Sequence, residues 1–311
     1  MIRHKHNADE SGSRRLQNDG RWGQRLKRFA IYALLLDFGF VYIYPIIYMI
    51  LVSLMPTSDL VNPTIKWLPT YLDFENFVQV YNTLKYSEAF VNTVMLAGVA
   101  SVLQTFCCSL AGYALAKFPV PGKKLWIGAL ILIFVIPGSL TLVPQYVLFN
   151  TYHLIGSPLS VWLPAVFGQG LKSSLFVLVF MQAFSYSKSY DEAAQIDGAG
   201  QIRIFFRIAM PMVVPTIILS LLLSFVWYWN ETAKSGLYLS GELTTLPLQL
   251  QNFNSLFGAA YPSSQGSSLN RLNERIQMAA TLLTVAPLML LYLVMQKQFV
   301  QGVEASGITG E

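Results

Sequence analysis

Six apolar stretches, each about as long as a bilayer is thick, constrain this chain more than any other feature of its sequence. The hydrocarbon core of a bilayer is about 30 Å thick and takes about 20 apolar residues of α-helix to cross. A backbone in lipid must satisfy its own hydrogen bonds, so each stretch is expected to be helical. The sequence therefore predicts an all-α membrane protein with six transmembrane helices. The stretches are 29–54, 88–116, 125–149, 159–184, 211–230 and 275–296.

Composition agrees with lipid as the main solvent. Charged residues make up 12% of the 311 residues, about half their share in soluble domains. The net charge of +5 would suit nucleic-acid binding, but the basic residues gather between the apolar stretches, as they do in membrane proteins. We therefore expect the chain to contact the lipid bilayer and no nucleic acid. Prolines recur within the stretches and either kink the helices around a transport pathway or reflect the general frequency of proline in membrane helices; they are Pro45, Pro137, Pro164, Pro215 and Pro287.

The distribution of Lys and Arg predicts the orientation in the membrane. Fifteen of the 21 Lys and Arg residues lie before the first stretch, between the second and third, between the fourth and fifth, or after the sixth. Cytoplasmic loops carry the excess of Lys and Arg, so both termini are expected in the cytoplasm. The predicted divisions are a cytoplasmic tail at 1–28, a membrane domain at 29–296 and a cytoplasmic tail at 297–311. The first stretch is too long for the core of a signal peptide.

A polar segment at 186–210 lies between the fourth and fifth stretches, on the predicted cytoplasmic side. It contains Glu192-Ala193-Ala194-Gln195-Ile196-Asp197-Gly198 and leads into Ile208-Ala209-Met210-Pro211. Gly198 is placed to end a short helix, and Pro211 is expected in the first turn of the fifth span. A second short helix is expected at about 201–209. Considered alone, the segment fits either a docking surface for a partner or an amphipathic element at the membrane interface.

The pattern from Glu192 to Pro211 resembles the EAA loop of ABC-importer permeases, with Met210 where that family usually has leucine. Other motifs resemble the carbohydrate permeases of the family, specifically the maltose G-type subunit. The resemblance covers most of the chain, and least the N-terminal tail and the outer loops. It implies the type I ABC importer permease fold, with the EAA loop as a cytoplasmic coupling helix. The other motifs are Asn92-Thr93, Gly112-Tyr113-Ala114-Leu115-Ala116-Lys117-Phe118, Pro121-Gly122-Lys123, Ile136-Pro137, Pro144, Trp229-Asn230 and Thr245-Leu246-Pro247.

The resemblance implies a permease subunit of an ATP-driven, binding-protein-dependent importer for a carbohydrate, such as an oligosaccharide. It implies a second, related permease subunit that completes the translocation pathway as a heterodimer, two ATP-binding subunits and an extracellular solute-binding protein. It also implies a multi-pass location in the bacterial inner (plasma) membrane. The residues expected to couple the permease to the ATPase are Glu192, Ala193, Ala194, Asp197, Gly198, Arg203 and Pro211.

The chain itself is not expected to be an enzyme. It contains no Walker A pattern, since Gly122-Lys123-Lys124 lacks both the leading glycine and the Ser or Thr of that motif. ATP and Mg²⁺ are therefore expected on the partner ATPase subunits, and this chain is expected to bind no cofactor. No metal site is predicted either. Cys107 and Cys108 are expected to be small apolar packing residues, and the histidines lack metal-site spacing.

The end of the fifth stretch is the candidate substrate pathway. Aromatic rings stack on sugar faces, and Asn and Glu side chains hydrogen-bond sugar hydroxyls. The alternative is an aromatic belt at the outer membrane interface. The outer loop that follows, at about 231–272, is either a linker or a loop that enters the binding protein. The candidate residues are Trp227, Tyr228, Trp229, Asn230 and Glu231.

Other transporters remain open as alternatives. The same architecture could import a polyol, a glycerol phosphate or an amino acid. An anionic solute would favour basic residues in the pathway, and because only Lys172 is a candidate, the sequence weighs mildly against such a solute. A secondary transporter would need inverted repeats and intramembrane carboxylates. The sequence shows no internal repeat, and Asp37 is the one carboxylate well inside a stretch.

Overall fold

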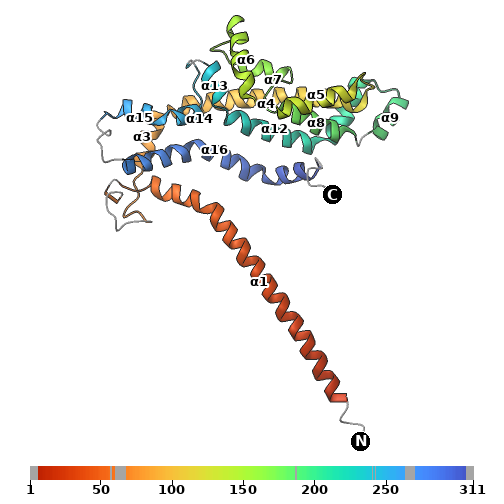
Figure 1. Ribbon diagram of the computed structural model, residues 1–311, viewed down its shortest axis with the longest axis vertical. Helices are drawn as coiled ribbons and strands as arrows, with labels where there is room; N and C mark the ends of the chain where they lie inside the picture. The colour runs from red at the N-terminus through yellow and green to blue at the C-terminus, as the bar shows by residue number, and fades with distance from the viewer. Residues whose placement is uncertain are drawn as a thin grey trace. The chain divides into compact units, whose positions relative to one another are not determined.

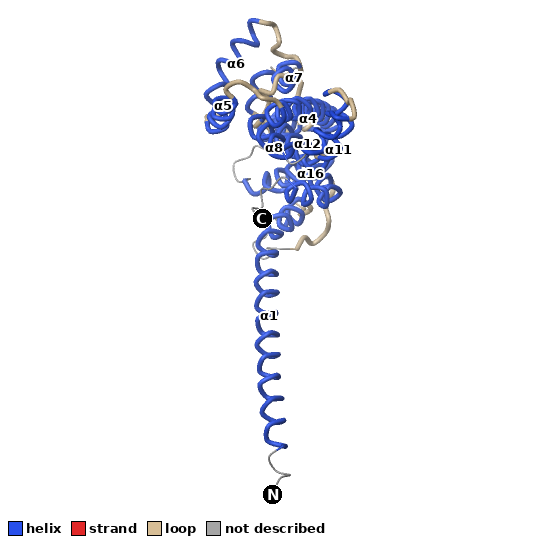
Figure 2. The backbone as a smooth tube through the Cα atoms, turned by 90° about the vertical axis from the view of Figure 1, so that its right-hand side faces the viewer, coloured by secondary structure: helices blue, strands red, loops and turns tan. Residues whose placement is uncertain are grey.

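The computed structural model describes residues 6–56, 58–59, 68–185, 188–239, 241, 243–262 and 270–305. Within these ranges the chain forms helices joined by loops, with no strand (Figures 1 and 2). This confirms the all-α prediction for the described part of the chain. The chain divides into two compact units, Met1–Asp73 and Phe74–Glu311.

The first unit is dominated by one long helix, α1 (His6–Ser53). Its part from Lys27 to Ser53 is long and apolar enough to cross a membrane, which agrees with the first predicted span. The helix begins at His6, so most of the predicted tail at 1–28 is helical. After the helix, the buried carboxylate of Asp59 accepts hydrogen bonds from the backbone N–H of Thr70 at 2.7 Å and from its hydroxyl at 2.8 Å.

The second unit is built on four helices that run side by side: α4 (Tyr86–Lys117), α8 (Ser173–Ser185), α12 (Val214–Trp229) and α16 (Asn270–Ala305) (Figure 1). Helix α4 lies at the centre and packs against both α8 and α12. The residues that it buries are mostly small, which lets neighbouring backbones approach closely in lipid. Its buried small residues include Ala97, Ala100, Ser101, Ser109 and Gly112.

Two of the predicted spans are interrupted near their middle. The stretch at 125–149 is divided into α5 (Lys123–Val135) and α6 (Ser139–Thr151), which meet at an angle of 98°. Pro137 explains the break, because proline lacks an N–H and disfavours helical geometry at the residue before it. Accordingly, Ile136 has an extended backbone with φ −65° and ψ 125°. The stretch at 159–184 is divided into α7 (Leu159–Val166) and α8.

Among the described residues, three helices are long and apolar enough to cross a membrane alone: Lys27–Ser53, Tyr86–Lys117 and Glu274–Gly302. The α5–α6 pair, and the pair of Gln201–Met212 with Val214–Trp229 bent by 78°, add two further candidates. Helix α8 is apolar but shorter. Of the prolines in the predicted spans, Pro137 lies at the break between α5 and α6. Pro45, Pro164 and Pro287 lie inside the helices α1, α7 and α16. The count of six membrane helices stays a prediction.

Short helices gather at one end of the second unit: α3 (Glu75–Thr83), α14 (Leu246–Gln251) and α15 (Phe253–Ala260) (Figure 1). A further short helix, α13 (Ala233–Tyr238), packs instead against α6 and α7. Two sequence motifs meet at the end formed by α3, α14 and α15. The Thr93 hydroxyl accepts a hydrogen bond from the Leu246 N–H at 2.9 Å, and the Asn92 amide donates to the Thr244 carbonyl at 3.2 Å. The motif at 92–93 therefore holds the start of α14 against α4.

Gly112 provides a test of the central packing. A Cβ at this position would lie 2.5 Å from the Phe180 Cβ and 2.8 Å from the Met181 backbone nitrogen. We expect Gly112→Ala to destabilise the protein by about 1–3 kcal/mol through overpacking. Thermal unfolding in detergent measures this.

Gly98→Ala is the matched control on the same helix, because a Cβ at Gly98 meets nothing within 4 Å. Alanine favours the helix over glycine by about 1 kcal/mol, so this variant should be as stable as the wild type or more so. Equal stability of the two variants would contradict the packing described for α4 and α8.

Candidate functional site

The segment predicted to couple with a partner is helical. It consists of α9 (Lys188–Ile196), α10 (Gln201–Ile204), the wider π-helical turn η1 (Phe205–Ala209) and α11 (Met210–Met212), which leads into α12. Helix α9 lies at the end of the second unit opposite to α14 and α15 (Figure 1). The expected second helix at about 201–209 is therefore present, with a π-helical second half.

Gly198 ends α9, as its position predicted. Its φ of +81° lies in the left-handed region that glycine adopts without a Cβ penalty. The Gly198 N–H donates to the Gln195 carbonyl at 3.0 Å, and the Ala199 N–H donates to the Ala194 carbonyl at 2.9 Å. This pair of hydrogen bonds is a Schellman motif, which fixes the direction in which the chain leaves α9.

The two alanines of the EAA pattern face different ways. Ala194 is buried, whereas Ala193 and Asp197 are exposed and Ile196 is 87% exposed. Helix α9 therefore has a narrow inner face and an outer face that is open in this chain. The side chain of Glu192 lies outside the described residues.

An aromatic cluster anchors the segment to the helices behind it. Phe205 is buried, and its ring centroid lies 5.0 Å from that of Tyr113 on α4 and 6.2 Å from that of Phe184 on α8. Edge-to-face ring pairs contribute about 0.5–1.5 kcal/mol beyond their burial. Ile204 is also fully buried, whereas Ile202 is 77% exposed.

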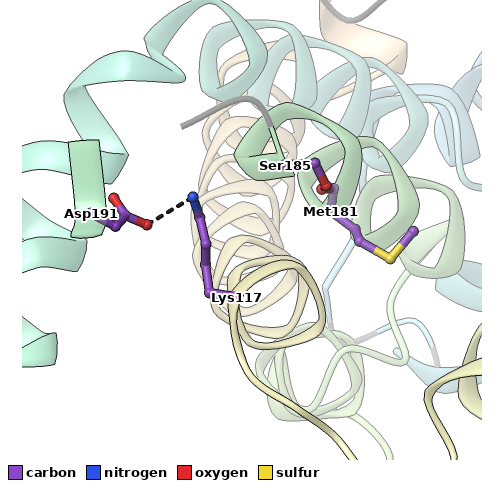
Figure 3. Close-up of polar contacts among 4 residues, drawn as sticks. All are labelled: Lys117, Met181, Ser185 and Asp191. Atoms are coloured by element: carbon purple, nitrogen blue, oxygen red, sulfur yellow. Dashed lines mark hydrogen bonds and ion pairs between the residues drawn. The ribbon is translucent and has the colours of Figure 1, made fainter. Parts of the chain in front are cut away.

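A buried ion pair ties α9 to α4. The Lys117 ammonium lies 2.7 Å from the Asp191 carboxylate, with the two side chains 7% and 5% exposed (Figure 3). Beside the pair, the hydroxyl of Ser185 on α8 donates to the Met181 carbonyl at 2.7 Å (Figure 3). Lys117 is the last residue of α4 and Asp191 lies in the first turn of α9.

Neither member of this pair was among the predicted coupling residues. The available signal was that Lys117 lies in the motif at 112–118 and that Asp191 directly precedes the EAA pattern. The other two predicted coupling residues, Arg203 and Pro211, are exposed. Pro211 lies in the first turn of α11, not of the fifth span, because the π-helical turn is followed by a separate short helix before Val214.

A second candidate site is a cavity of about 570 Å³ in the second unit. Its walls come from both sides of the α5–α6 bend, the loop between α7 and α8, the start of α8 and the α12–α13 junction. The Tyr238 hydroxyl of α13 donates to the Leu142 carbonyl of α6 at 3.2 Å, which holds two of these walls together. Residues of the cavity include Phe134, Pro137, Gly138, Gln145, Gly170, Lys172, Ser173, Trp227, Asn230, Glu231 and Lys234.

The structure divides the five predicted pathway residues. Trp227, Asn230 and Glu231 line the cavity, whereas Tyr228 and Trp229 are not among its lining residues. The Tyr228 hydroxyl donates to Gln104 Oε1 at 2.6 Å and accepts from the Leu171 N–H at 3.2 Å.

Trp229 is 2% exposed and packs against Phe90 and Phe225, with ring centroids 6.1 and 5.7 Å away. Of the two charged residues noted within the apolar stretches, Lys172 lines the cavity, and Asp37 is an exposed residue of α1. Of the two predicted packing cysteines, Cys108 is buried in the hydrophobic core and Cys107 is half-buried.

Comparison with known proteins identifies the family. Residues 20–305 match the family described as "Binding-protein-dependent transport system inner membrane component". The chain belongs to this family. The match covers almost all of the described residues, including the segment at α9–α11 and every wall of the cavity.

The sequences of relatives align with this permease over nearly their full length. It is 27% identical over 303 residues to the osmoprotective compounds uptake permease protein GgtD of Synechocystis, covering 95% of this chain and 97% of the relative. It is 27% identical over 277 residues to the arabinooligosaccharides transport system permease protein AraQ of Halalkalibacterium halodurans, covering 88% and 93%.

The fold agrees with that of a solved importer. A chain in the crystal structure of a bacterial ABC transporter involved in the import of the acidic polysaccharide alginate superposes with a TM-score of 0.72 at 22% identity. The superposition covers 88% of this chain and 97% of that chain. The permease therefore has the ABC importer permease fold, as the resemblance of its motifs predicted.

The ion pair makes a prediction about stability. Lys117→Met leaves the Asp191 carboxylate buried without its ammonium partner, and breaking a buried pair in this way costs about 3–5 kcal/mol. We expect a clearly lowered unfolding temperature of the purified permease in detergent. The double variant Lys117→Met/Asp191→Leu removes both charges and should recover most of the loss.

Lys124→Met, at an exposed position near the start of α5, is the matched control and should unfold like the wild type. If Lys117→Met and Lys124→Met unfolded at the same temperature, Lys117 and Asp191 would not form a buried pair.

Proposed function

We propose that this permease is a subunit of an ATP-driven importer for a carbohydrate, and that it forms the translocation pathway together with a second, related permease subunit. The substrate class is supported by the carbohydrate-type motifs at 112–118 and 245–247 and by the relative whose name states arabinooligosaccharide transport. An extracellular solute-binding protein delivers the solute. The chain lies in the bacterial inner membrane with both termini, and α9, on the cytoplasmic side.

The α9–α11 segment is the contact with an ATP-binding subunit. Support comes from its exposed apolar side chains, since Ile196, Ile202 and Phe206 are 87%, 77% and 52% exposed. Exposed apolar patches of this kind mark interaction sites. The predicted coupling residues Ala193, Asp197 and Arg203 are exposed on the same segment. ATP and Mg²⁺ are bound by the partner subunits, and this chain performs no hydrolysis.

The ion pair and the aromatic cluster make α9 a rigid lever. Lys117 joins α9 to α4, and Phe205 joins the following turn to α4 and α8. A displacement of α9 by closure of the ATPase dimer is therefore passed to the helices that form the cavity wall, instead of being absorbed in a loose loop. Alternating access then requires two discrete arrangements of these helices.

One observation supports the proposal most strongly. Helix α9, which carries the EAA pattern and has an exposed outer face, is attached to the central helix α4 by the buried ion pair between Lys117 and Asp191. The direct test is ATPase activity of the complex co-purified in lipid with its partner subunits, with the binding protein and a panel of saccharides. We expect stimulation by the binding protein loaded with one saccharide class. An intact complex that no saccharide stimulates would contradict the carbohydrate assignment.

A second candidate solute is a small osmoprotective compound. It is favoured by the relative that is similar over 303 residues and is named for the uptake of such compounds. Polyols belong in the same panel, and stimulation by a polyol but no saccharide would select this alternative without changing the architecture. A secondary transporter is disfavoured by membership of a binding-protein-dependent family.

Gly198 tests the lever directly. We expect Gly198→Val to reduce transport at least about tenfold while ATP hydrolysis continues, because a β-branched residue at φ +81° costs roughly 1–3 kcal/mol of strain. The exit from α9 would then change direction. Transport and hydrolysis are measured together in proteoliposomes.

Gly200→Val is the matched control two residues away. Gly200 has φ −71° and ψ 155°, which valine adopts readily, and a Cβ at either glycine meets nothing within 4 Å. The two variants therefore differ in backbone strain and not in crowding. Wild-type coupling in Gly198→Val would contradict the lever.

A further inference from the structure

A loop without helical structure forms part of the wall of the cavity. Residues 168–172, the cavity loop, join α7 to α8, and all five of them line the cavity. Gly168 and Lys172 at its two ends have φ of +68° and +56°, which a right-handed α-helix does not contain. The loop lies inside the predicted span at 159–184, where non-helical backbone is tolerated if protein or a cavity surrounds it. Its backbone polar groups therefore need partners from neighbouring helices.

Leu171 finds these partners in two buried side chains. Gln104 of α4 donates from Nε2 to the Leu171 carbonyl at 2.7 Å, and the Tyr228 hydroxyl of α12 accepts from the Leu171 N–H at 3.2 Å. The same hydroxyl donates to Gln104 Oε1 at 2.6 Å, which closes a ring of three hydrogen bonds. Gln104 and Tyr228, both buried, are called the Leu171 clamp below.

The clamp closes in one arrangement. Gln104 Nε2 also donates to the Ser224 hydroxyl at 3.2 Å, so the amide uses its nitrogen as a donor twice and its oxygen as an acceptor. If the amide were turned over, its oxygen would face the Leu171 carbonyl oxygen. Gly170 leaves the room that the clamp needs, because a Cβ there would collide with the Gln104 amide oxygen and the Tyr228 hydroxyl.

Helix α4 also holds the chain on both sides of the cavity loop. Before the loop, Trp162 Nε1 of α7 donates to the Leu96 carbonyl of α4 at 3.3 Å. After the loop, the Cys108 thiol of α4 donates to the Ser173 carbonyl at 3.6 Å. With Gln104 between them, three positions along α4 are bonded to the chain from α7 to α8. The cavity loop is therefore fastened to α4 over its whole length.

Both helices of the clamp lead to the segment proposed to contact the ATPase. Gln104 lies on the same unbroken helix as Lys117, whose ammonium is 2.7 Å from the Asp191 carboxylate of α9. Tyr228 lies near the end of α12, and α12 begins directly after α11. A displacement of α9 to α11 therefore reaches the cavity loop along two helices, which meet at Leu171.

We propose that Gln104 and Tyr228 are positioning residues that make the cavity loop move with α4 and α12, so that a displacement of α9 changes the shape of the cavity. Tyr228, which the sequence placed in the substrate pathway, thus acts through Leu171. The inference rests on the proposed contact between α9 and an ATP-binding subunit. It is independent of which solute the permease carries.

The test uses a cysteine reporter in the cavity loop. Gln169 lines the cavity with an exposed side chain, and Gln169→Cys is labelled with N-ethylmaleimide in the intact importer complex in lipid nanodiscs. The rate in the complex without this cysteine, which retains Cys107 and Cys108, is subtracted. We expect the labelling rates without nucleotide and after trapping with ATP and vanadate to differ at least about tenfold, because the two arrangements are discrete.

Adding Tyr228→Phe to the reporter should reduce this difference to less than about threefold, because the Leu171 N–H and Gln104 Oε1 both lose their partner. The rates are compared at equal amounts of trapped nucleotide. Gln104→Met removes the clamp from the other side and should give the same loss. The double variant should lose no more than either single variant, since the two residues act as one unit.

Tyr86→Phe is the matched control. The Tyr86 hydroxyl of α4 donates to the Leu283 carbonyl of α16 at 3.1 Å, and Tyr86 lies outside the described lining of the cavity. This variant also loses a tyrosine hydroxyl and a hydrogen bond between helices, so it measures general loosening of the bundle. It should retain the full difference in labelling rate.

A full difference in Tyr228→Phe or in Gln104→Met would overturn the proposal, and so would an equal loss in Tyr86→Phe. These outcomes leave the proposed function intact, because the reporter in the otherwise unchanged complex still responds to nucleotide. If that reporter showed no response, the contact between α9 and the ATPase would fail, and the role of the clamp would fail with it.

Discussion

Lipid cannot satisfy a backbone hydrogen bond, and this constraint explains both the regular and the irregular parts of the permease. Where helices face lipid or one another they are continuous, as in α4 and α16. Irregular backbone within a membrane is tolerated where it is buried in protein or lines a cavity. The interruptions near the middle of two predicted spans, at 136–138 and 167–172, both contribute residues to the same cavity. These two breaks therefore coincide with the second candidate site.

The sequence predicted the helical class and the helix stop at Gly198, because each depends on local residue type: the length of the apolar stretches, and a glycine that adopts a left-handed turn. It did not predict the bond between Lys117 and Asp191, because a pairing between charges far apart in the chain has no local signature. The sequence also predicted that Tyr228 and Trp229 would line the substrate pathway together with Trp227. Successive residues of a helix point about 100° apart, so neighbours at 227–229 face different surroundings.

A buried ion pair is weak support for stability as such, since two apolar residues of similar size often serve as well. In this permease the pair fixes the position of α9. Both side chains are buried, at 7% and 5% exposure, so the pair holds α9 in one arrangement against α4. The Schellman turn at Gly198 sets the direction in which the chain leaves α9. The ion pair, the Schellman turn and the aromatic cluster around Phe205 therefore hold the short helix α9 at three places. A helix held in this way can pass on a displacement to its neighbours.

The central claim is that the exposed face of α9 is the contact with an ATP-binding subunit. The most direct measurement is photo-crosslinking of the assembled complex in membranes, with benzoylphenylalanine at Ile196 and, as a control, at Leu140, which is 68% exposed on α6. The account predicts a crosslink from position 196 to the ATP-binding subunit and none from position 140. Crosslinks to that subunit from position 140 alone, in an intact complex, would contradict it.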